Sequence, residues 1–452
     1  MYKTEKFNLD LDNKEFNFAL DLVNSGKEKI IYLTGKAGTG KTTFLKHLKK
    51  NRPKNMLILA PTGVAAINAG GVTIHSFFQV PFGPFVPDDK RLREESSDSY
   101  EEDQRNIFTT FKYYKKKRKP IENIELLVID EISMVRADML DVIDKILRVF
   151  SGKNPEESFG GIPVILIGDA FQLSPIAKQN EWQILAPFYN TPYFFSSNVF
   201  KFNQPVHIEL LKVYRQKEQN YIDLLNRIRV NNLDYDDLDL LNSRYVQNYN
   251  TEKYSNYIVL ATHNRTVDQI NAYKLRQLES ELIYFEANIK GKFPDNSYPV
   301  EQKLGLKVGA QVMFTKNDPQ KKIFNGKIGK VIQVSSDSIL VGFEDESIVK
   351  VEPAVWENIS YSFDDKSGQI KEEQVGSFTQ FPLRLAWAIT VHKSQGLTFD
   401  RVIADLSDSF APGQVYVALS RCSTFDGLVL KSRISRNAIK TDRNVLEFAS
   451  SI

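Results

Sequence analysis

Four short apolar runs in the first half of the chain have the pattern of buried strands. They cover residues 30–34, 56–60, 126–129 and 164–167. Nearly every position in each run is apolar, which is typical of parallel strands covered by helices on both faces. Between these runs apolar residues recur at helical spacing, most clearly from 139 to 150. The pattern predicts an α/β domain.

The same α/β pattern returns in the second half, where a β-rich segment interrupts it. Strands are predicted at 257–261 and 401–406, and a short helix at 415–422. Between them, short strand-like runs are separated by Asn-Gly or acidic turns, as in a small barrel. We predict a first α/β domain at 1–77 and 104–204, a small helical and loop insertion at 78–103, a second α/β domain at 205–295 and 382–452, and a β-barrel insertion at 296–381.

A phosphate-binding loop follows the first strand. Residues 35–42 match G-x-x-x-x-G-K-[ST] at every fixed position, and a helix-forming segment comes next. Glycines let successive backbone N–H groups point into one concavity, to which the helix N-terminus adds partial positive charge. We assign Lys41 to the β- and γ-phosphates and the Thr42 hydroxyl to magnesium. The predicted nucleotide contacts in this loop are Gly35, Ala37, Gly38, Thr39, Gly40, Lys41 and Thr42.

Two carboxylates stand directly after the strand at 126–129. Parallel sheets place their ligands at the carboxyl ends of strands, so Asp130 and Glu131 are expected near the phosphates. Asp130 is positioned to hold magnesium, and Glu131 is the candidate base that deprotonates the attacking water. Gln172 follows the next strand and is a candidate contact of the γ-phosphate, although a turn amide that satisfies local backbone is the alternative.

Composition narrows the class of protein. The 452 residues carry a net charge of only +3, which argues against coating nucleic acid by bulk charge but allows a local basic groove. The basic run 115–119 suits phosphates or, equally, a solvated face. A single cysteine, Cys422, excludes an internal disulfide and a cysteine zinc cluster, and the five histidines are scattered. Without a membrane-length apolar segment or a signal peptide, we expect a soluble intracellular protein, cytoplasmic and nucleoid-associated if bacterial.

The order of these motifs resembles the helicases of superfamily one, in the RecD-like branch, and most closely the PIF-one family of 5′-to-3′ DNA helicases. The matching segments are 35–42, 61–66, 73–77, 130–131, 168–175, 214–216, 390–398 and 416–422. Distinguishing features are Thr-Gly-Val-Ala-Ala, Thr-Ile-His-Ser-Phe, Phe-Gly-Gly at 159–161 and Val-His-Lys-Ser-Gln-Gly at 391–396. The resemblance covers nearly the whole chain.

The resemblance implies a fold and a set of roles that spacing alone does not give. It implies two RecA-like P-loop NTPase-type domains, with a wedge-bearing insertion in the first and an SH3-like barrel in the second. Arg215 and Arg421 resemble the two arginines that reach the γ-phosphate from the second domain, and Gln395 and Gly396 resemble nucleotide-site residues. Single-stranded DNA is expected at Thr62, Gly63, Thr73, His75, Thr262, His263, Asn264, Thr390, His392 and Lys393.

The implied function is ATP- and Mg²⁺-dependent translocation on single-stranded DNA and unwinding of tailed duplex DNA in genome maintenance, with G-quadruplex DNA as a further candidate partner and a monomer favoured. An RNA helicase or remodeller, and a nucleotide-gated nucleic-acid clamp, are the alternatives. On its own, His75 is more often a hydrogen-bonded structural histidine. One departure concerns the base, because such helicases carry an adenine-reading glutamine upstream of the phosphate loop. Here no glutamine precedes Gln79, and Phe16 or Asn17 occupies the place.

Overall fold

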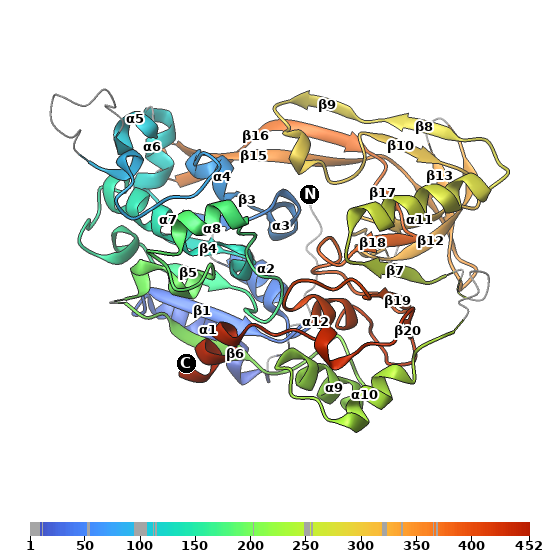
Figure 1. Cartoon of the computed structure of the whole chain (residues 1–452). Coiled ribbons are helices and arrows are strands. Elements are labelled where there is room, and N and C mark those ends of the chain that lie inside the picture. Colours follow the sequence, from blue (N-terminus) through green and yellow to red (C-terminus); the bar gives the residue numbers. More distant parts are fainter. Residues whose placement is uncertain are drawn as a thin grey trace.

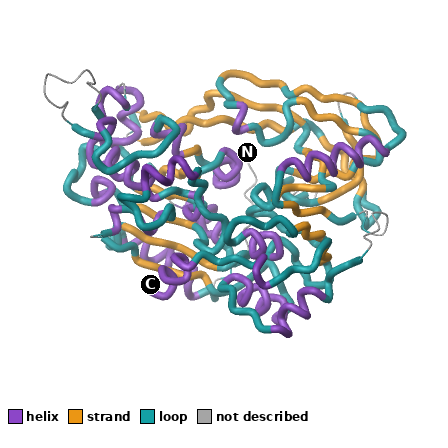
Figure 2. Tube along the Cα trace, viewed as in Figure 1, coloured by secondary structure: helices purple, strands orange, loops and turns teal. Residues whose placement is uncertain are grey.

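The computed structural model describes residues 10–452, apart from residues 11, 52–54, 95–105, 112, 114, 202, 248–253, 255, 319–322, 336–337, 365 and 368. Two α/β domains lie side by side, and β-strands of the insertion run along one edge of both (Figure 1). Figure 2 shows the strands of the two α/β domains lying among helices and loops, whereas the long strands of the insertion lie along the top of the view. The predicted fold class is confirmed. Residues 95–103 of the small insertion predicted at 78–103 lie outside the described residues.

The first domain is built on a six-stranded parallel sheet. Its strands are β1 (Ile30–Gly35), β2 (Met56–Ala60), β3 (Val72–Thr73), β4 (Leu126–Ile129), β5 (Val164–Ile167) and β6 (Val206–Leu210), in the order β3-β2-β4-β5-β1-β6. The predicted boundary after residue 204 is wrong for β6, because β6 pairs with β1 from Ile31↔Val206 to Gly35↔Leu210. The alternation of Val206, Ile208 and Leu210 predicts a strand but does not specify its sheet.

Alternate side chains of each strand enter separate cores on the two faces of this sheet. Ile31 and Leu33 pack with α1 (Lys14–Ser25) and α2 (Lys41–Asn51), whereas Tyr32 faces the core that includes α7 (Ala137–Phe150). This two-sided burial explains the continuous apolar runs in the sequence. The other helices of the domain are α3 (Gly63–Ala69), α4 (Ile74–Phe78), α5 (Ile107–Thr110), α6 (Lys115–Glu122) and α8 (Gln179–Leu185), with 3₁₀ turns η1 (Lys90–Leu92), η2 (Ile132–Met134), η4 (Phe194–Ser196) and η5 (Asn198–Phe200).

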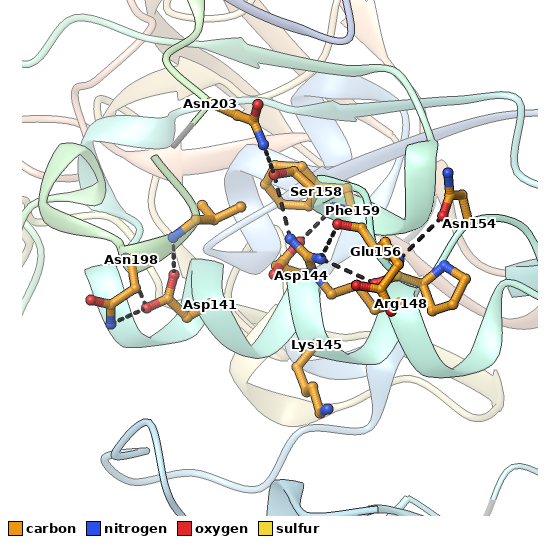
Figure 3. Close-up of polar contacts among 12 residues, drawn as sticks. Asp141, Asp144, Lys145, Arg148, Asn154, Glu156, Ser158, Phe159, Asn198 and Asn203 are labelled. Carbon is orange, nitrogen blue, oxygen red and sulfur yellow. Dashed lines mark hydrogen bonds and ion pairs between the residues drawn. The ribbon is translucent and has the colours of Figure 1, made fainter. Parts of the chain in front are cut away.

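A polar network ties α7 to the Phe-Gly-Gly segment that leads into β5 (Figure 3). Asp144 accepts hydrogen bonds from Arg148 and from the backbone N–H of Phe159, and Arg148 also donates to the Glu156 carbonyl at 2.9 Å. Gly160 lies in the 3₁₀ turn η3 (Ser158–Gly161) with φ of 64°, and a Cβ there would approach the Leu147 carbonyl oxygen to 2.6 Å. A glycine is therefore required where this turn packs against α7.

The second domain contains a four-stranded parallel sheet. Its strands are β7 (Ile258–Ala261), β18 (Ala388–Thr390), β19 (Val402–Asp405) and β20 (Leu428–Leu430), in the order β18-β7-β19-β20. Its helices are α9 (Gln219–Arg229), α10 (Tyr235–Asn242), α11 (Asn264–Gln277) and α12 (Gln414–Leu419), and a 3₁₀ turn η8 (Arg436–Ala438) follows. Two first-domain residues, Ala37 and Leu173, pack into the core of this second domain, so the domains share an apolar contact.

Antiparallel strands form the insertion in the second domain. They are β8 (Ile283–Glu286), β9 (Asn288–Gly291), β10 (Lys303–Leu306), β11 (Gln311–Phe314), β12 (Ile328–Val334), β13 (Ile339–Gly342), β14 (Ile348–Val351), β15 (Ala354–Asp364), β16 (Gln369–Gln380) and β17 (Leu383–Leu385), with the 3₁₀ turn η6 (Asp295–Ser297). A five-stranded sheet has the order β14-β13-β12-β11-β17. β8 pairs with β10 in a separate two-stranded sheet, and β17 pairs with β11, so the β segment extends beyond the predicted limits of 296 and 381.

Two segments cross from the second domain to the first. The β15–β16 hairpin reaches over α6, where Tyr361 enters the first core and the backbone N–H of Ile370 donates to the side chain of Asn55 at 2.6 Å. The last helix, α13 (Arg443–Ser451), lies on the first domain, with the ring of Phe448 stacked on Phe195 at 4.2 Å. In the part of the chain that the structure describes, no helix has the length and apolar character of a membrane span.

Candidate functional site

The phosphate loop joins β1 to α2 and is shaped by glycines. Gly38 and Gly40 have φ of 83° and 94°, a region that favours glycine. The ammonium group of Lys41 donates to the carbonyls of Gly35 and Lys36, at 2.5 and 3.0 Å, so it lies across the mouth of the loop. Burial lowers the pKa of Lys41. The negative charge of a bound phosphate would stabilise the charged form of Lys41 and raise its pKa again.

The two carboxylates stand at the end of β4, as the sequence predicts. Burial raises the pKa of both Asp130 and Glu131, and for Asp130 the neighbouring charge of Glu131 adds to the effect. Glu131 has φ of 54°, which turns the chain sharply after the strand. Gln395 of the second domain donates to the Oε2 of Glu131 at 2.8 Å and to the side-chain oxygen of Gln172 at 3.4 Å. The structure thus brings residues from three distant segments together.

Two arginines of the second domain face the same loop. Arg215 donates to the Ser420 carbonyl at 3.1 Å, and its Cβ packs so tightly on Gly38 that a Cβ on Gly38 would lie 2.5 Å away. Arg421, which is only 1% exposed, donates to the Val417 carbonyl at 2.9 Å. Burial lowers the pKa of both guanidinium groups, and for Arg215 the charge of Arg421 lowers it further. Two like charges held close together favour binding of an anion beside them.

A cavity of about 630 Å³ lies between the domains and joins these groups. From the first domain it is lined by Lys41, Thr42, Glu131 and Gln172, and from the second by Arg215, Thr398, Gly396 and Arg421. The remaining lining residues are Asp10, Phe16, Ala37, Gly38, Thr39, Gly40, Thr43 and Tyr214. Cations and carboxylates therefore surround one space that neither domain encloses alone.

Phe16, which stands where the family carries a glutamine, lines this cavity together with Asp10 and Tyr214. The side chain of Phe16 has no polar atom that could form a hydrogen bond with a base. Its ring packs edge-on against Phe44 in the core, with 5.2 Å between the ring centroids. Tyr214 donates its hydroxyl to Asp10 and accepts from the side chain of Asn13, each at 2.9 Å, and its ring lies over Gly40. This part of the cavity therefore has an aromatic ring and a carboxylate.

The residues predicted to contact single-stranded DNA lie at the ends of several helices and β-strands. Thr62 and Thr73 cap α3 and α4 by accepting from the backbone N–H groups of Ala65 and Ser76, so these hydroxyls have local roles as well. Thr262 and His263 follow β7, and Asn264 begins α11. Thr390 ends β18, and His392 and Lys393 follow it. The ring of His75 stacks on the exposed ring of Phe82 at 4.6 Å.

Gly63 differs from the other predicted DNA contacts because the insertion covers it. A Cβ at Gly63 would lie 2.8 Å from the hydroxyl of Ser297, in the turn η6. Ile67, one helical turn further along α3, packs with Phe293 and Trp356 of the same insertion. Single-stranded DNA that contacts Gly63 would have to displace the turn η6.

Sequence reasoning missed three residues that join the domains. The hydroxyl of Tyr416 accepts from the backbone N–H of Ala37 in the phosphate loop at 3.0 Å, and Asp169 pairs with Arg229 at 2.9 Å. Tyr416 and Asp169 lie inside segments already singled out by their motifs. Arg229 ends an amphipathic helix and carries no local signal.

Two α/β domains with one phosphate loop, one acidic pair and two arginines across the cleft define a nucleotide-driven motor protein of the P-loop class. Comparisons with known proteins place the chain more narrowly. Residues 9–237 match the family model described as PIF1-like helicase. The chain is 32% identical to the "ATP-dependent DNA helicase Pif1" of Bdellovibrio bacteriovorus, over 95% of this chain and 90% of that protein. The chain belongs to the PIF1-like helicase family.

Two solved structures of Bacteroides sp Pif1 are similar to this one to different degrees. The complex with ADP-AlF4 has 42% identity and a TM-score of 0.85, covering 97% of this chain and 96% of that one. The complex with single-stranded DNA has the same identity and coverage but a TM-score of 0.66. The overall arrangement of this chain is thus more similar to the first complex than to the second.

Proposed function

We propose that this protein is an ATP-dependent DNA helicase that translocates 5′-to-3′ on single-stranded DNA and unwinds duplex DNA. The observation that carries the proposal is the composite cavity, in which Lys41 and Glu131 of one domain face Arg215 and Arg421 of the other. Hydrolysis at such a site changes the contacts between two domains and therefore their spacing. Family membership supports DNA as the nucleic acid along which the protein moves, since the Bdellovibrio relative is named a DNA helicase.

In this proposal the residues have distinct roles in phosphoryl transfer. Lys41 and the loop N–H groups bind the phosphates, while Arg215 and Arg421 stabilise the charge that develops on the γ-phosphoryl group. Glu131 takes the proton of the attacking water, and Gln172 and Gln395 orient groups beside it. Opening and closing of the cleft alternate the grip of the two domains on the strand.

Magnesium fits the donor set of this chain. Asp130 and Glu131 form a carboxyl pair whose pKa values are raised, which a cation nearby would reverse. The Thr42 hydroxyl and Asp130 would hold the ion, which neutralises phosphate charge when bound. Adenine is the proposed base, with Tyr214 as its stacking surface and less strict selection than an upstream glutamine provides.

The strand contacts, domain division and biological setting belong to the same proposal. Single-stranded DNA would cross the predicted contact residues on both domains, which include His75, His263 and Lys393. A division into two RecA-like domains, a wedge-bearing insertion and an SH3-like insertion follows from the motif order. A monomer that acts on tailed duplex and G-quadruplex DNA in genome maintenance, including repair, recombination and telomere maintenance, is the form we propose.

Unwinding of tailed duplexes tests the function directly. Duplexes with a 5′ or a 3′ single-stranded tail of equal length are incubated with protein and ATP, and strand release is measured. We expect release from the 5′-tailed substrate alone. Preference for the 3′ tail would contradict the polarity, equal stimulation of ATP hydrolysis by RNA would favour an RNA remodeller, and binding without appreciable hydrolysis would favour a clamp.

A further inference from the structure

One arginine of the second domain is inserted into the first domain next to the catalytic cleft. Arg229 ends α9, whose apolar face packs in the second core. Its guanidinium is 2.9 Å from the carboxylate of Asp169, lies over the ring of Phe171 at 4.0 Å, and is 3.9 Å from Glu209. Both members of the Arg229–Asp169 pair are buried, at 9% and 1% exposure. A buried pair of this kind is costly to break because one charge is then left without a partner.

Asp169 holds the turn that presents Gln172. One carboxylate oxygen accepts from Arg229 and from the backbone N–H of Phe171 at 3.2 Å, and the other accepts from the side-chain amide of Gln172 at 3.2 Å. This bond directs the carbonyl oxygen of Gln172 toward Gln395, which also donates to Glu131. A continuous polar chain therefore runs from Arg229 to the base that activates water.

The same pair also affects the ionisation of Asp169. Burial alone would raise the pKa of Asp169, but Arg229, and after it Lys41, bring that pKa below its ordinary value. Arg229 therefore favours the ionised form of Asp169, which accepts the hydrogen bond from Gln172.

Arg229 differs in its partners from the two arginines assigned to the γ-phosphate. The described hydrogen bonds of Arg215 and Arg421 run to groups of the second domain, at Ser420, Val417 and Leu397. Arg229 instead binds the first domain directly. On the basis of the proposed function, we propose that Arg229 is a positioning residue that couples the placement of the second domain to the orientation of Gln172.

Steady-state ATP hydrolysis with single-stranded DNA tests this role. Arg229→Gln is expected to lower kcat about 10- to 100-fold, because a small displacement of catalytic groups is enough for such a loss. The matched control is Arg227→Gln on the same helix, where Arg227 pairs with Asp237 but its side chain is 40% exposed. This control should stay within about twofold of the wild-type protein.

A second variant separates positioning from general stability. Asp169→Asn combined with Arg229→Gln leaves no unpaired buried charge, so its melting temperature should return close to that of the wild type. If Arg229 has a positioning role, kcat stays low in this stable double variant, and Arg229→Lys recovers part of it. Recovery of kcat together with stability in the double variant, or a wild-type kcat in Arg229→Gln, would overturn the inference. A wild-type protein without DNA-stimulated hydrolysis would instead refute the proposed function.

Discussion

The side-chain amide of Gln395 donates to the Oε2 of Glu131 at 2.8 Å, although 264 positions separate the two residues. Glu131 follows the strand β4 of the first domain, and Gln395 follows the strand β18 of the second. The carboxylate assigned to activate water therefore has one of its hydrogen bonds supplied by the other domain. Any motion that separates the domains alters the environment of this base.

Replacing the base tests its chemical role. Glu131→Gln is expected to lower DNA-stimulated kcat about 10²- to 10⁴-fold, the usual contribution of a general base. Nucleotide affinity should stay close to that of the wild type, because an amide of the same shape still accepts from Gln395. The measurement pairs steady-state hydrolysis with titration of a fluorescent nucleotide. Glu125→Gln, at the exposed start of the same strand, is the control, and unchanged turnover in Glu131→Gln would disprove the assigned mechanism.

The arginine that packs on the phosphate loop should affect chemistry more than binding. Arg215→Ala is expected to reduce kcat about 10³- to 10⁵-fold, as loss of a charge-stabilising arginine does in related chemistry. Lys217→Ala changes an exposed cation two residues away and should have little effect. Single-turnover hydrolysis measures the chemical step directly. A loss of less than about tenfold in Arg215→Ala would mean that Arg421 alone supplies the charge.

The pH dependence of hydrolysis should report the raised pKa of Glu131. A carboxyl group with a raised pKa is active above that pKa and loses its basic form as the pH falls through it. The acidic limb of kcat/KM should therefore lie above the ordinary glutamate range of about 4.3. The Gln395 hydrogen bond lowers the pKa of Glu131, so Gln395→Ala should move this limb to higher pH. Profiles of both proteins over about pH 5 to 9 provide the measurement, and a limb that moves to lower pH in Gln395→Ala would contradict the assignment.

Loosening the β15–β16 hairpin should strengthen binding of single-stranded DNA. Tyr361 anchors the hairpin in the first core, and the same insertion places Ser297 against the predicted DNA contact Gly63. Tyr361→Ala should weaken this docking and tighten the Kd for a labelled oligonucleotide about three- to tenfold, because less free energy is needed to uncover the site. Tyr284→Ala, at an exposed position of the same insertion, is the control. Unchanged or weaker DNA affinity in Tyr361→Ala would show that the docked hairpin does not compete with single-stranded DNA.

Much of the local structure could be predicted from the sequence because its causes are local. The phosphate loop needs only a strand, glycines at positive φ and a helix, all within residues 30–51. The Asp130-Glu131 pair follows from one apolar strand that ends in carboxylates. Sheet membership is not local, so the domain limits predicted at 204 and 205 do not include β6 in the sheet to which its pairing with β1 assigns it.

The sequence by itself determined the fold class, the phosphate loop and the order of motifs along the chain. Tertiary structure alone decided which distant groups meet, namely Tyr416 with Ala37, Arg229 with Asp169, and Ser297 with Gly63. These contacts form when two separately cored domains and an insertion approach one another. Their energies depend on burial and on the low dielectric between the domains, and neither is encoded in the spacing of any single motif.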